Sequence, residues 1–427
     1  MMRSHRRSNS REHSFLSSSV LMAGAPDSAP TIGVLGGGQL GRMLAIDARA
    51  SGLRCVVRTD EQPGGSAAQV ADAEFVGPYD DAALNSAFLA ACDVVTAEFE
   101  NLPAALLEAL AEHRPVRPSA HSIGICQHRR REKEFLAANA IPHAPFAVVR
   151  SAADVVSALG LLGGRGVLKT AAFGYDGRGQ ERLDQSAMSA TEIAAAWSRL
   201  GANEAVLEQL IAFEREISVV GARGEDGAWV SYPPGENVHI AGILDHTIAP
   251  ARIGARAAAE AASIAEAIAA ALGHVGTIGV EFFVLTDGSL VVNEMAPRPH
   301  NSGHHTLDAC SVSQFGQQWR AALGLPLAIA SQHTPAVMMN LLGDLWSNGE
   351  PTWATVVDDP TVRLHLYGKS GPRPGRKMGH LCVLGRAEES MPGLVDRALA
   401  VRAGLLGRRP GSASNGALGS SLEVHPW

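Results

Sequence analysis

Short apolar runs alternate with amphipathic helical patterns from residue 31 onward. The first apolar run is followed by three glycines and then by a helical pattern, which is the order of a β-α-β unit. Strands that alternate with helices in this way pair in parallel. We therefore expect a parallel sheet built from strands at 32–35, 55–57, 73–76 and 94–97, with helices at 43–50, from Asp81 and after Pro103.

The pattern changes after residue 141. Pro142 and Pro145 end the helix that contains Lys133, and strands and helices mix from there in an α+β manner. Beyond Val337 the chain consists mainly of short apolar strands. We expect a disordered extension at 1–30, three domains at 31–140, 141–335 and 336–405, and a flexible tail at 406–427.

Charge and cysteine content narrow the class of protein. Of 427 residues, 36 are Lys or Arg and 43 are Asp or Glu, so the net charge of −7 argues against a nucleic-acid or membrane-surface binder. Five scattered cysteines without a C-x-x-C pair indicate reduced thiols in a cytoplasmic protein. No membrane span is expected. Residues 1–30 are rich in Arg and Ser and could mimic a transit peptide, but they lack an amphipathic stripe.

The most informative segment places two carboxylates opposite one another. Asp287-Gly288 between two apolar runs predicts a β-hairpin with a two-residue turn. In that register Glu281 faces Glu294, about 5 Å apart between Cβ atoms. Two like charges in an apolar hairpin need a cation between them, and oxygen ligands suit Mg²⁺ or Mn²⁺ with nucleotide phosphates. A carboxylate dyad that shares one proton is the alternative.

A glycine motif follows the first strand. Residues 36–41, Gly-Gly-Gly-Gln-Leu-Gly, open a helix, and Asp60 lies at the spacing of a dinucleotide fingerprint. Glycines allow backbone N–H groups to approach an anion at a helix N-terminus, whichever anion it is. The motif thus predicts ligand binding, with a packing turn as the alternative and NAD as one possible ligand.

A second glycine-rich segment follows Lys169. It runs Phe-Gly-Tyr-Asp-Gly-Arg-Gly-Gln to residue 180 and combines flexible backbone with cations. Such a loop suits a lid over a polyphosphate, and an ordinary Asp-Gly turn is the alternative.

Two further polar stretches complete the candidates. Residues 297–305 contain three histidines, which would suit either zinc or a loop that lines a substrate pocket; the absence of a matching Cys or Asp/Glu cluster favours the pocket. Residues 369–377 carry two lysines and two arginines in a Pro/Gly loop, which matches a substrate phosphate, or a solvated turn.

Four of these runs, in this order, resemble the ATP-grasp superfamily and within it the carboxyaminoimidazole ribonucleotide synthetase family of purine biosynthesis. They are Gly-Gly-Gly-Gln-Leu-Gly-Arg-Met-Leu from Gly36, Gly-Tyr-Asp-Gly-Arg-Gly-Gln from Gly174, Asn-Glu-Met-Ala-Pro-Arg-Pro-His-Asn-Ser-Gly-His from Asn293, and Arg-Pro-Gly-Arg-Lys-Met-Gly-His from Arg373. The resemblance implies a Rossmann-like N-terminal domain, a central ATP-grasp domain and a small β-rich C-terminal domain, α/β and α+β in class, as a homodimer.

The resemblance also implies residue roles. Lys169 and Arg298 would be catalytic, and Glu281 and Glu294 would hold magnesium. ATP would be bound by Arg129, Lys169, Gly174, Tyr175, Asp176, Gly177, Arg178, Gly179, Gln180, Glu208, Gln209, Leu210, Ile211, Glu216, His239, Asn293 and Glu294. The ribonucleotide would be bound by Gln39, Glu98, Tyr175, Asp176, Arg298, His300, Lys369, Arg376 and Lys377. The glycine motif would then belong to the ribonucleotide pocket.

The reaction that the resemblance implies joins bicarbonate to aminoimidazole ribonucleotide with ATP, through carboxyphosphate. Three rival hypotheses stay open at the level of sequence. They are a formate-dependent ATP-grasp transformylase, an NAD-dependent oxidoreductase that uses the first glycine loop, and a nucleotide sensor without turnover.

Overall fold

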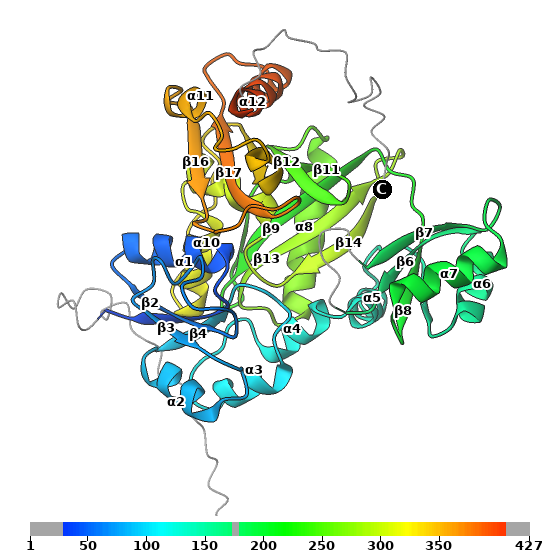
Figure 1. The fold of residues 1–427 in the computed structure, drawn as a ribbon, viewed down its shortest axis with the longest axis horizontal. Coiled ribbons are helices and arrows are strands. Elements are labelled where there is room, and N and C mark those ends of the chain that lie inside the picture. Colours follow the sequence, from blue (N-terminus) through cyan, green and yellow to red (C-terminus); the bar gives the residue numbers. More distant parts are fainter. Residues whose placement is uncertain (1–28, 173–178, 407–427) are drawn as a thin grey trace, which may run out of the picture.

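The structure is a computed structural model that describes residues 29–172 and 179–406. Its N-terminal domain, blue to cyan in Figure 1, contains the parallel sheet that the sequence predicts. The strand order is β3-β2-β1-β4. Strand β1 is buried along its whole length because helices cover both faces. The elements are β1 (Thr31–Leu35), α1 (Gln39–Ala50), β2 (Arg54–Thr59), β3 (Ala73–Val76), α2 (Ala82–Ala90), β4 (Val94–Ala97), α3 (Ala104–Ala111) and α4 (Ala120–Cys126).

Helix α5 (Arg129–Ala138) leads into a small lobe with its own apolar core. In this lobe four antiparallel strands run in the order β5-β8-β6-β7, and two helices pack on the sheet. Figure 1 shows the lobe standing to one side of the main body. Its elements are β5 (Phe146–Val149), α6 (Ala152–Leu161), β6 (Arg165–Thr170), β7 (Gln180–Asp184), α7 (Ala190–Leu200) and β8 (Ala205–Gln209).

The centre of the molecule is one large antiparallel sheet of order β14-β13-β9-β11-β12-β15-β17-β16, with β10 beside β9. Helix α8 covers one face through alanines and Ile268, which pack against β9, β13 and β14. The elements are β9 (Arg215–Arg223), β10 (Trp229–Ser231), β11 (Gly235–Ile240), β12 (Ile243–Ala249), α8 (Ala255–Ala271), β13 (Gly276–Val284), β14 (Leu290–Ala296), the 3-10 helix η3 (Asn301–His305), α9 (Thr306–Ala309) and α10 (Gln314–Ala322).

The three C-terminal strands do not form a sheet of their own. Strand β15 pairs with β12, so β15, β17 and β16 extend the central sheet, and helix α12 packs on them. The sequence predicts the strands but not this continuity. The elements are β15 (Ala336–Leu342), the 3-10 helix η4 (Gly343–Trp346), α11 (Ala354–Val357), β16 (Val362–Leu366), β17 (Lys377–Leu384) and α12 (Met391–Leu405).

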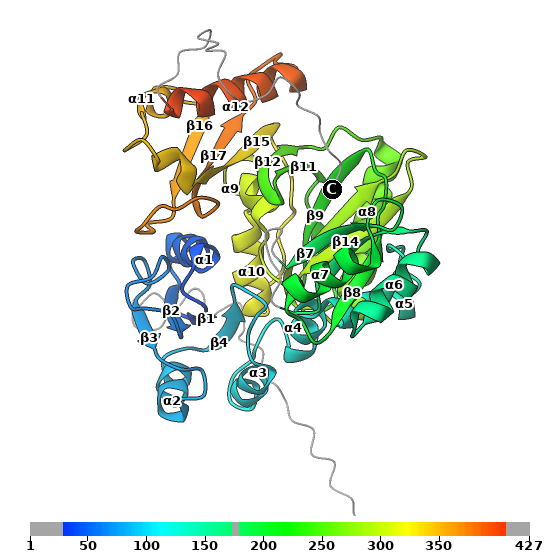
Figure 2. The same ribbon diagram turned by 45° about the vertical axis from the view of Figure 1, so that its right-hand side comes forward.

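Helix α10 joins the central sheet to the N-terminal domain (Figure 2). Phe315 and Trp319 pack into the core beneath α1. Asp47 of α1 accepts hydrogen bonds from Ser313 Oγ at 2.6 Å and from Trp319 Nε1 at 2.7 Å. A helix that lies in the central region of the sequence thus fixes the N-terminal domain against the central sheet.

The hairpin that pairs Glu281 with Glu294 has a different turn from the predicted one. The turn contains three residues, because the Leu285 N–H donates to Ser289 O and Val284 pairs with Leu290. A two-residue turn was therefore the wrong prediction. A β-bulge at Asn293 then adds one residue to β14 and returns the register to Glu281 opposite Glu294. The predicted pairing is correct because the two departures cancel.

The structure tests only some of the predictions about the chain termini, membrane spans and cysteines. The predicted extension 1–30 and tail 406–427 lie almost entirely outside the described residues. Within the described ranges, no helix is long and apolar enough to cross a membrane. All five cysteines are buried as free thiols, and burial raises the pKa of Cys55 to about 12.

Candidate active site

One cleft of about 710 Å³ lies where the N-terminal domain, the small lobe and the central sheet meet. Most of the residues singled out from the sequence line it. They are Gln39, Glu98, Arg129, Lys169, Gln180, Glu208, Gln209, Leu210, Ile211, Glu216, His239, Glu281, Asn293, Glu294, Arg298, His300, Lys369, Arg376 and Lys377.

The predicted lid can be placed only at its end. Gly174, Tyr175, Asp176, Gly177 and Arg178 lie outside the described residues. Gly179 has a φ of +70°, and a Cβ there would lie 2.7 Å from Thr170 Oγ1, so this position requires glycine. It does not line the cleft, whereas Gln180 does.

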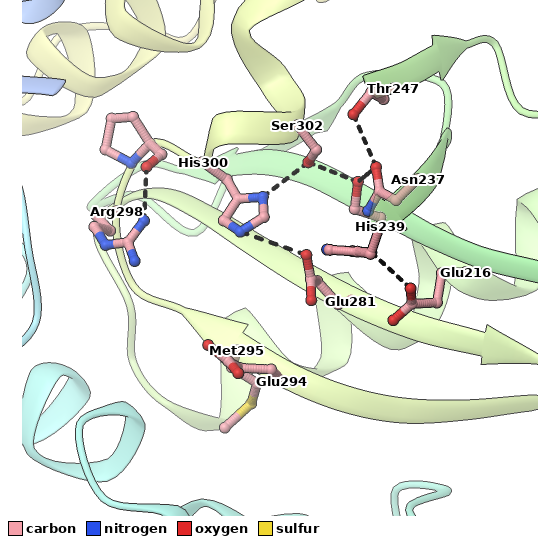
Figure 3. Close-up of polar contacts among 12 residues, drawn as sticks. Glu216, Asn237, His239, Thr247, Glu281, Glu294, Met295, Arg298, His300 and Ser302 are labelled. Atoms are coloured by element: carbon pink, nitrogen blue, oxygen red, sulfur yellow. Dashed lines mark hydrogen bonds and ion pairs between the residues drawn. The ribbon is translucent and has the colours of Figure 1, made fainter. Parts of the chain in front are cut away.

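Glu281 and Glu294 project from neighbouring strands into the cleft (Figure 3). His300 Nε2 lies 3.6 Å from Glu281 Oε1, and Arg129 Nη1 lies 3.4 Å from Glu294 Oε2. Burial raises the pKa of Glu281 to about 7, His239 opposes that shift, and the charges of Glu216 and Glu294 add to it. The neighbouring cations thus do not fully compensate the charge of the buried Glu281 carboxylate.

This shortage fits a hard divalent cation. Magnesium is usually held by one or two carboxylates together with substrate phosphates. Among residues 29–172 and 179–406 no group of three or more His, Cys, Asp or Glu side chains could hold a metal without such a partner. The two carboxylates therefore fit a metal that arrives with a nucleotide better than a metal in a closed protein site.

The carboxylate of Glu208, on strand β8 of the small lobe, contacts two lysines. Its Oε2 lies 3.0 Å from Lys169 Nζ and 3.5 Å from Lys133 Nζ. Burial alone would raise the pKa of this carboxyl, but Lys133, Lys169 and Arg129 together lower it to about 2. Burial and the neighbouring cations lower the pKa of Lys169, which Glu208 opposes. Lys169 thus lines the cleft, and an anionic ligand there would stabilise its charged form.

An aromatic pair that the sequence reasoning missed forms an apolar wall beside this charge cluster. Phe213 and Phe283 stack with ring centroids 4.4 Å apart and planes 14° apart, and both line the cleft. A flat apolar wall suits a purine ring. Phe283 lies two residues after Glu281, so strand periodicity could have indicated that it shares the face of that carboxylate.

The first glycine motif binds a carboxylate of the protein itself. The N–H of Gly41 donates to Glu98 Oε2 at 2.6 Å, and the N–H of Gly38 donates to Glu98 Oε1. A Cβ on Gly36 would lie 2.5 Å from Glu98 Cγ. The position where a dinucleotide would place its pyrophosphate is filled, so the structure argues against the NAD hypothesis.

Arg298 is held by a partner that the sequence reasoning did not single out. Glu100 accepts from Arg298 Nε at 2.5 Å and from Nη2 at 3.1 Å, and both residues line the cleft. Glu100 follows β4 and Arg298 follows β14, so the pair joins two domains. No local pattern relates residues about two hundred positions apart.

The basic segment 369–377 also lines the cleft. Lys369 Nζ donates to Gln39 Oε1 at 2.6 Å, and burial together with Arg376 and Lys377 lowers its pKa to about 8. Arg373 also lines the cleft, although it was not among the predicted substrate residues. Of the three histidines at 300–305, only His300 lines the cleft, because His304 and His305 are buried in the core.

Known families match successive parts of the chain. The ribonucleotide synthetase preATP-grasp domain matches residues 29–127, the ATP-grasp domain matches 134–315, and the phosphoribosylaminoimidazole carboxylase C-terminal domain matches 336–392. The N5-carboxyaminoimidazole ribonucleotide synthase of Brucella melitensis is 44% identical over 351 residues, which cover 82% of this chain and 95% of that protein. The chain belongs to the N5-carboxyaminoimidazole ribonucleotide synthase family.

Solved structures of this synthase family share the fold. The enzyme from Staphylococcus aureus complexed with ADP is 35% identical, with a TM-score of 0.79 over 87% of this chain and 96% of that one. The synthase from Aspergillus clavatus in complex with ADP and 5-aminoimidazole ribonucleotide is 30% identical, with a TM-score of 0.77 over 87% and 98%.

Membership of the synthase family confirms the predicted fold class, which combines a preATP-grasp domain, an ATP-grasp domain and a C-terminal domain. It also confirms the predicted enzyme class. The chain is an ATP-grasp ligase that forms a carbon–nitrogen bond and releases ADP.

Proposed function

We propose that this chain carboxylates 5-aminoimidazole ribonucleotide with bicarbonate and ATP, in purine biosynthesis. Family membership supports the reaction. The single observation that carries it is that one cleft contains the Glu281 and Glu294 pair together with the cations of the small lobe and the basic segment 369–377. One site can therefore hold a nucleotide at one end and a phosphorylated acceptor at the other.

At the nucleotide end, we assign the triphosphate to Arg129 and Lys169, with residues 174–180 as the lid. Glu208, Gln209, Leu210 and Ile211 frame the adenine against the Phe213–Phe283 wall. Glu216 takes the ribose and is oriented by His239, whose Nδ1 lies 2.7 Å from Glu216 Oε2. Asn293 and Glu294 complete this end.

Glu281 and Glu294 are the residues that would hold Mg²⁺. The metal, when bound with ATP, would neutralise charge on the transferring phosphoryl group. The carboxylates themselves face one another across β13 and β14 and so orient that end of the cleft.

At the acceptor end, Arg298, His300, Lys369, Arg376 and Lys377 bind the ribonucleotide phosphate, since Arg and Lys in a fixed loop suit phosphate recognition. Gln39 and Glu98 line the cleft and are assigned to the imidazole and ribose. Tyr175 and Asp176 are assigned to them from the family resemblance alone, because both lie outside the described residues. Glu98 is held by the glycine-loop amides and so presents a fixed carboxylate to sugar hydroxyls.

The reaction takes two steps in this assignment. A bicarbonate oxygen attacks the γ-phosphorus and the bond to ADP breaks, which gives carboxyphosphate and ADP. The exocyclic amine then attacks the carboxyl carbon, inorganic phosphate leaves, and the amine loses a proton. Lys169 and Arg298, as fixed cations, stabilise the negative charge that moves through both steps.

We further propose that two copies of the chain form a homodimer, which the family resemblance implies.

A coupled ADP-release assay tests the reaction. ADP should appear only with ATP, bicarbonate and aminoimidazole ribonucleotide together, and its amount should match the carboxylated product. Release that requires formate, with none from bicarbonate, would point to the transformylase instead. Tight NADH binding in a fluorescence titration would support the oxidoreductase hypothesis. ATP binding without turnover on any acceptor would indicate a nucleotide sensor.

A further inference from the structure

Helix α5 presents three charged side chains to three consecutive residues of strand β14. Arg129 Nη1 lies 3.4 Å from Glu294 Oε2, Glu132 Oε1 accepts from the N–H of Met295 at 2.5 Å, and Lys133 Nζ donates to the carbonyl of Asn293 at 2.8 Å. Positions i, i+3 and i+4 share one face of a helix, so all three contacts come from a single turn. Glu132 and Lys133 are 1% and 0% exposed.

These contacts lie on a stretch of β14 whose pairing with other strands is incomplete. The strand lies at the edge of the central sheet, and the bulge at Asn293 interrupts its pairing with β13. Backbone groups that lose ladder partners need others when they are buried. Glu132 and Lys133 supply them on both sides of Glu294 in sequence, so they fix the backbone that carries this carboxylate.

Lys133 also reaches the opposite wall of the cleft. Its Nζ lies 3.5 Å from Glu208 Oε2 on strand β8 of the small lobe. Lys133 thus ties Glu208 in the small lobe to Asn293 in the central sheet. Lys169 shares the same Glu208 oxygen at 3.0 Å but lines the cleft. If an anionic ligand draws Lys169 away from Glu208, Lys133 remains beside that carboxylate.

Stability alone does not explain these buried charges. An apolar replacement of a buried ion pair is often neutral or stabilising, because desolvation offsets most of the attraction. We infer that Glu132 and Lys133 are positioning residues of the nucleotide site, which we call the α5 clamp. The clamp sets the direction of Glu294 and the distance between the two walls that receive ATP. This inference rests on the proposed function only in taking the cleft as an ATP site.

Two matched pairs of variants test the α5 clamp. Glu132→Leu removes the acceptor for Met295, whereas Glu132→Gln keeps it. Lys133→Met removes the charge and the donor, whereas Arg131→Ala changes an exposed side chain of the same helix. ADP affinity is measured by calorimetry with and without Mg²⁺, and the KM values for ATP and for aminoimidazole ribonucleotide are measured separately. Circular dichroism reports whether each variant is folded.

Glu132→Leu and Lys133→Met should weaken ADP binding at least tenfold and raise the KM for ATP similarly, while the KM for the ribonucleotide stays within twofold. Glu132→Gln and Arg131→Ala should remain close to the parent enzyme. ADP affinity within twofold of the parent in the folded variants overturns the inference. So does a parallel rise of both KM values, which would indicate general loosening.

Failure of both disruptive variants to fold, while both controls fold, would assign the clamp to stability and also overturn the inference. A failure of the proposed function is distinguishable from either result. The parent enzyme would then bind ADP but show no turnover with bicarbonate and aminoimidazole ribonucleotide, and the calorimetric comparison would still decide the role of the clamp.

Discussion

The clearest conflict between single side chains in the cleft is that of the Glu281 and Glu294 carboxylates. Glu281 faces Glu294 across one strand pair, with His300 3.6 Å from Glu281 and Arg129 3.4 Å from Glu294. Like charges at this spacing destabilise the free protein. The sequence locates this conflict by counting along a hairpin, although the actual turn and bulge differ from the predicted ones.

Replacing either carboxylate with its amide should remove a metal ligand without changing the shape of the side chain. We expect Glu281→Gln or Glu294→Gln to lower kcat by several orders of magnitude, because the metal that stabilises phosphoryl transfer is then poorly held. Steady-state ADP release at saturating substrate measures this. Glu260→Gln, on the exposed face of α8, is the control. Turnover close to that of the parent in either cleft variant would contradict the metal assignment.

Lys377 lines the cleft, at the end that we assign to the acceptor, and should act through binding. Lys377→Ala is expected to raise the KM for aminoimidazole ribonucleotide with a smaller change in kcat, since a phosphate contact is present before and during reaction. Arg363→Ala, on the neighbouring strand β16 and exposed, should leave that KM unchanged. An unchanged KM in the Lys377 variant would remove the residue from the phosphate site.

At the scale of elements, the glycine motif between β1 and α1 binds a carboxylate of the protein in place of an external anion. Three N-terminal glycines leave room for the Glu98 side chain, which occupies the place of an external anion. The sequence predicts that amides gather there. It does not predict that the anion is a side chain 60 residues further on, because that contact needs β4 to lie beside β1.

Adding one methyl group in this turn should be costly. Gly36 has a φ of +110°, and its Cβ would overlap Glu98. We expect Gly36→Ala to lower the free energy of unfolding by at least about 2 kcal/mol, from backbone strain and the overlap. Urea denaturation measures this. Gly254→Ala has open space at its Cβ, so its cost should stay below about 1 kcal/mol. Equal losses in the two variants would contradict the packing argument.

His274 ties helix α4 to strand β13 in its neutral form. Nε2–H donates to the Thr277 carbonyl at 3.0 Å, while Nδ1 lies 2.8 Å from Ser122 Oγ. Burial lowers its pKa from 6.5 to about 4. Between these values the unfolded chain binds a proton that the folded chain does not, so folded stability falls as the pH drops from about 6.5 to about 4 and levels off below.

The histidine should contribute up to about 3 kcal/mol to this loss of stability. His274→Gln removes the titrating group, so its free energy of unfolding should fall less over the same window. Urea denaturation at pH 4, 5, 6 and 7 compares the two proteins. The same slope in both would show that other groups govern acid sensitivity.

At the scale of the whole molecule, the cleft exists because three units meet. The small lobe brings Lys169 and Glu208, the central sheet brings Glu281 and Glu294, and the N-terminal domain brings Glu98. Helix α10 and the shared central sheet hold the first and last domains in place around them. A change that loosens these contacts would affect both substrates at once, unlike a change within the α5 clamp.

The proposed homodimer gives a direct test on the intact protein. Light scattering coupled to size exclusion should report a mass about twice the 44.6 kDa of one chain. The mass should stay constant on dilution through the micromolar range if the contact is permanent. A mass of one chain at every concentration would contradict the dimer.

The sequence by itself determined what depends on local order: the β-α-β start, the hairpin, the glycine turns and the residue types that suit a metal nucleotide. Apolar periodicity and turn chemistry act over a few residues, so they can be read along the chain. Only the tertiary structure decided three sets of contacts. Glu98 accepts hydrogen bonds from the glycine loop, Glu100 pairs with Arg298, and Glu132 and Lys133 bind the backbone of β14. Those contacts join residues far apart in the chain, and packing of separate elements, not local preference, creates them.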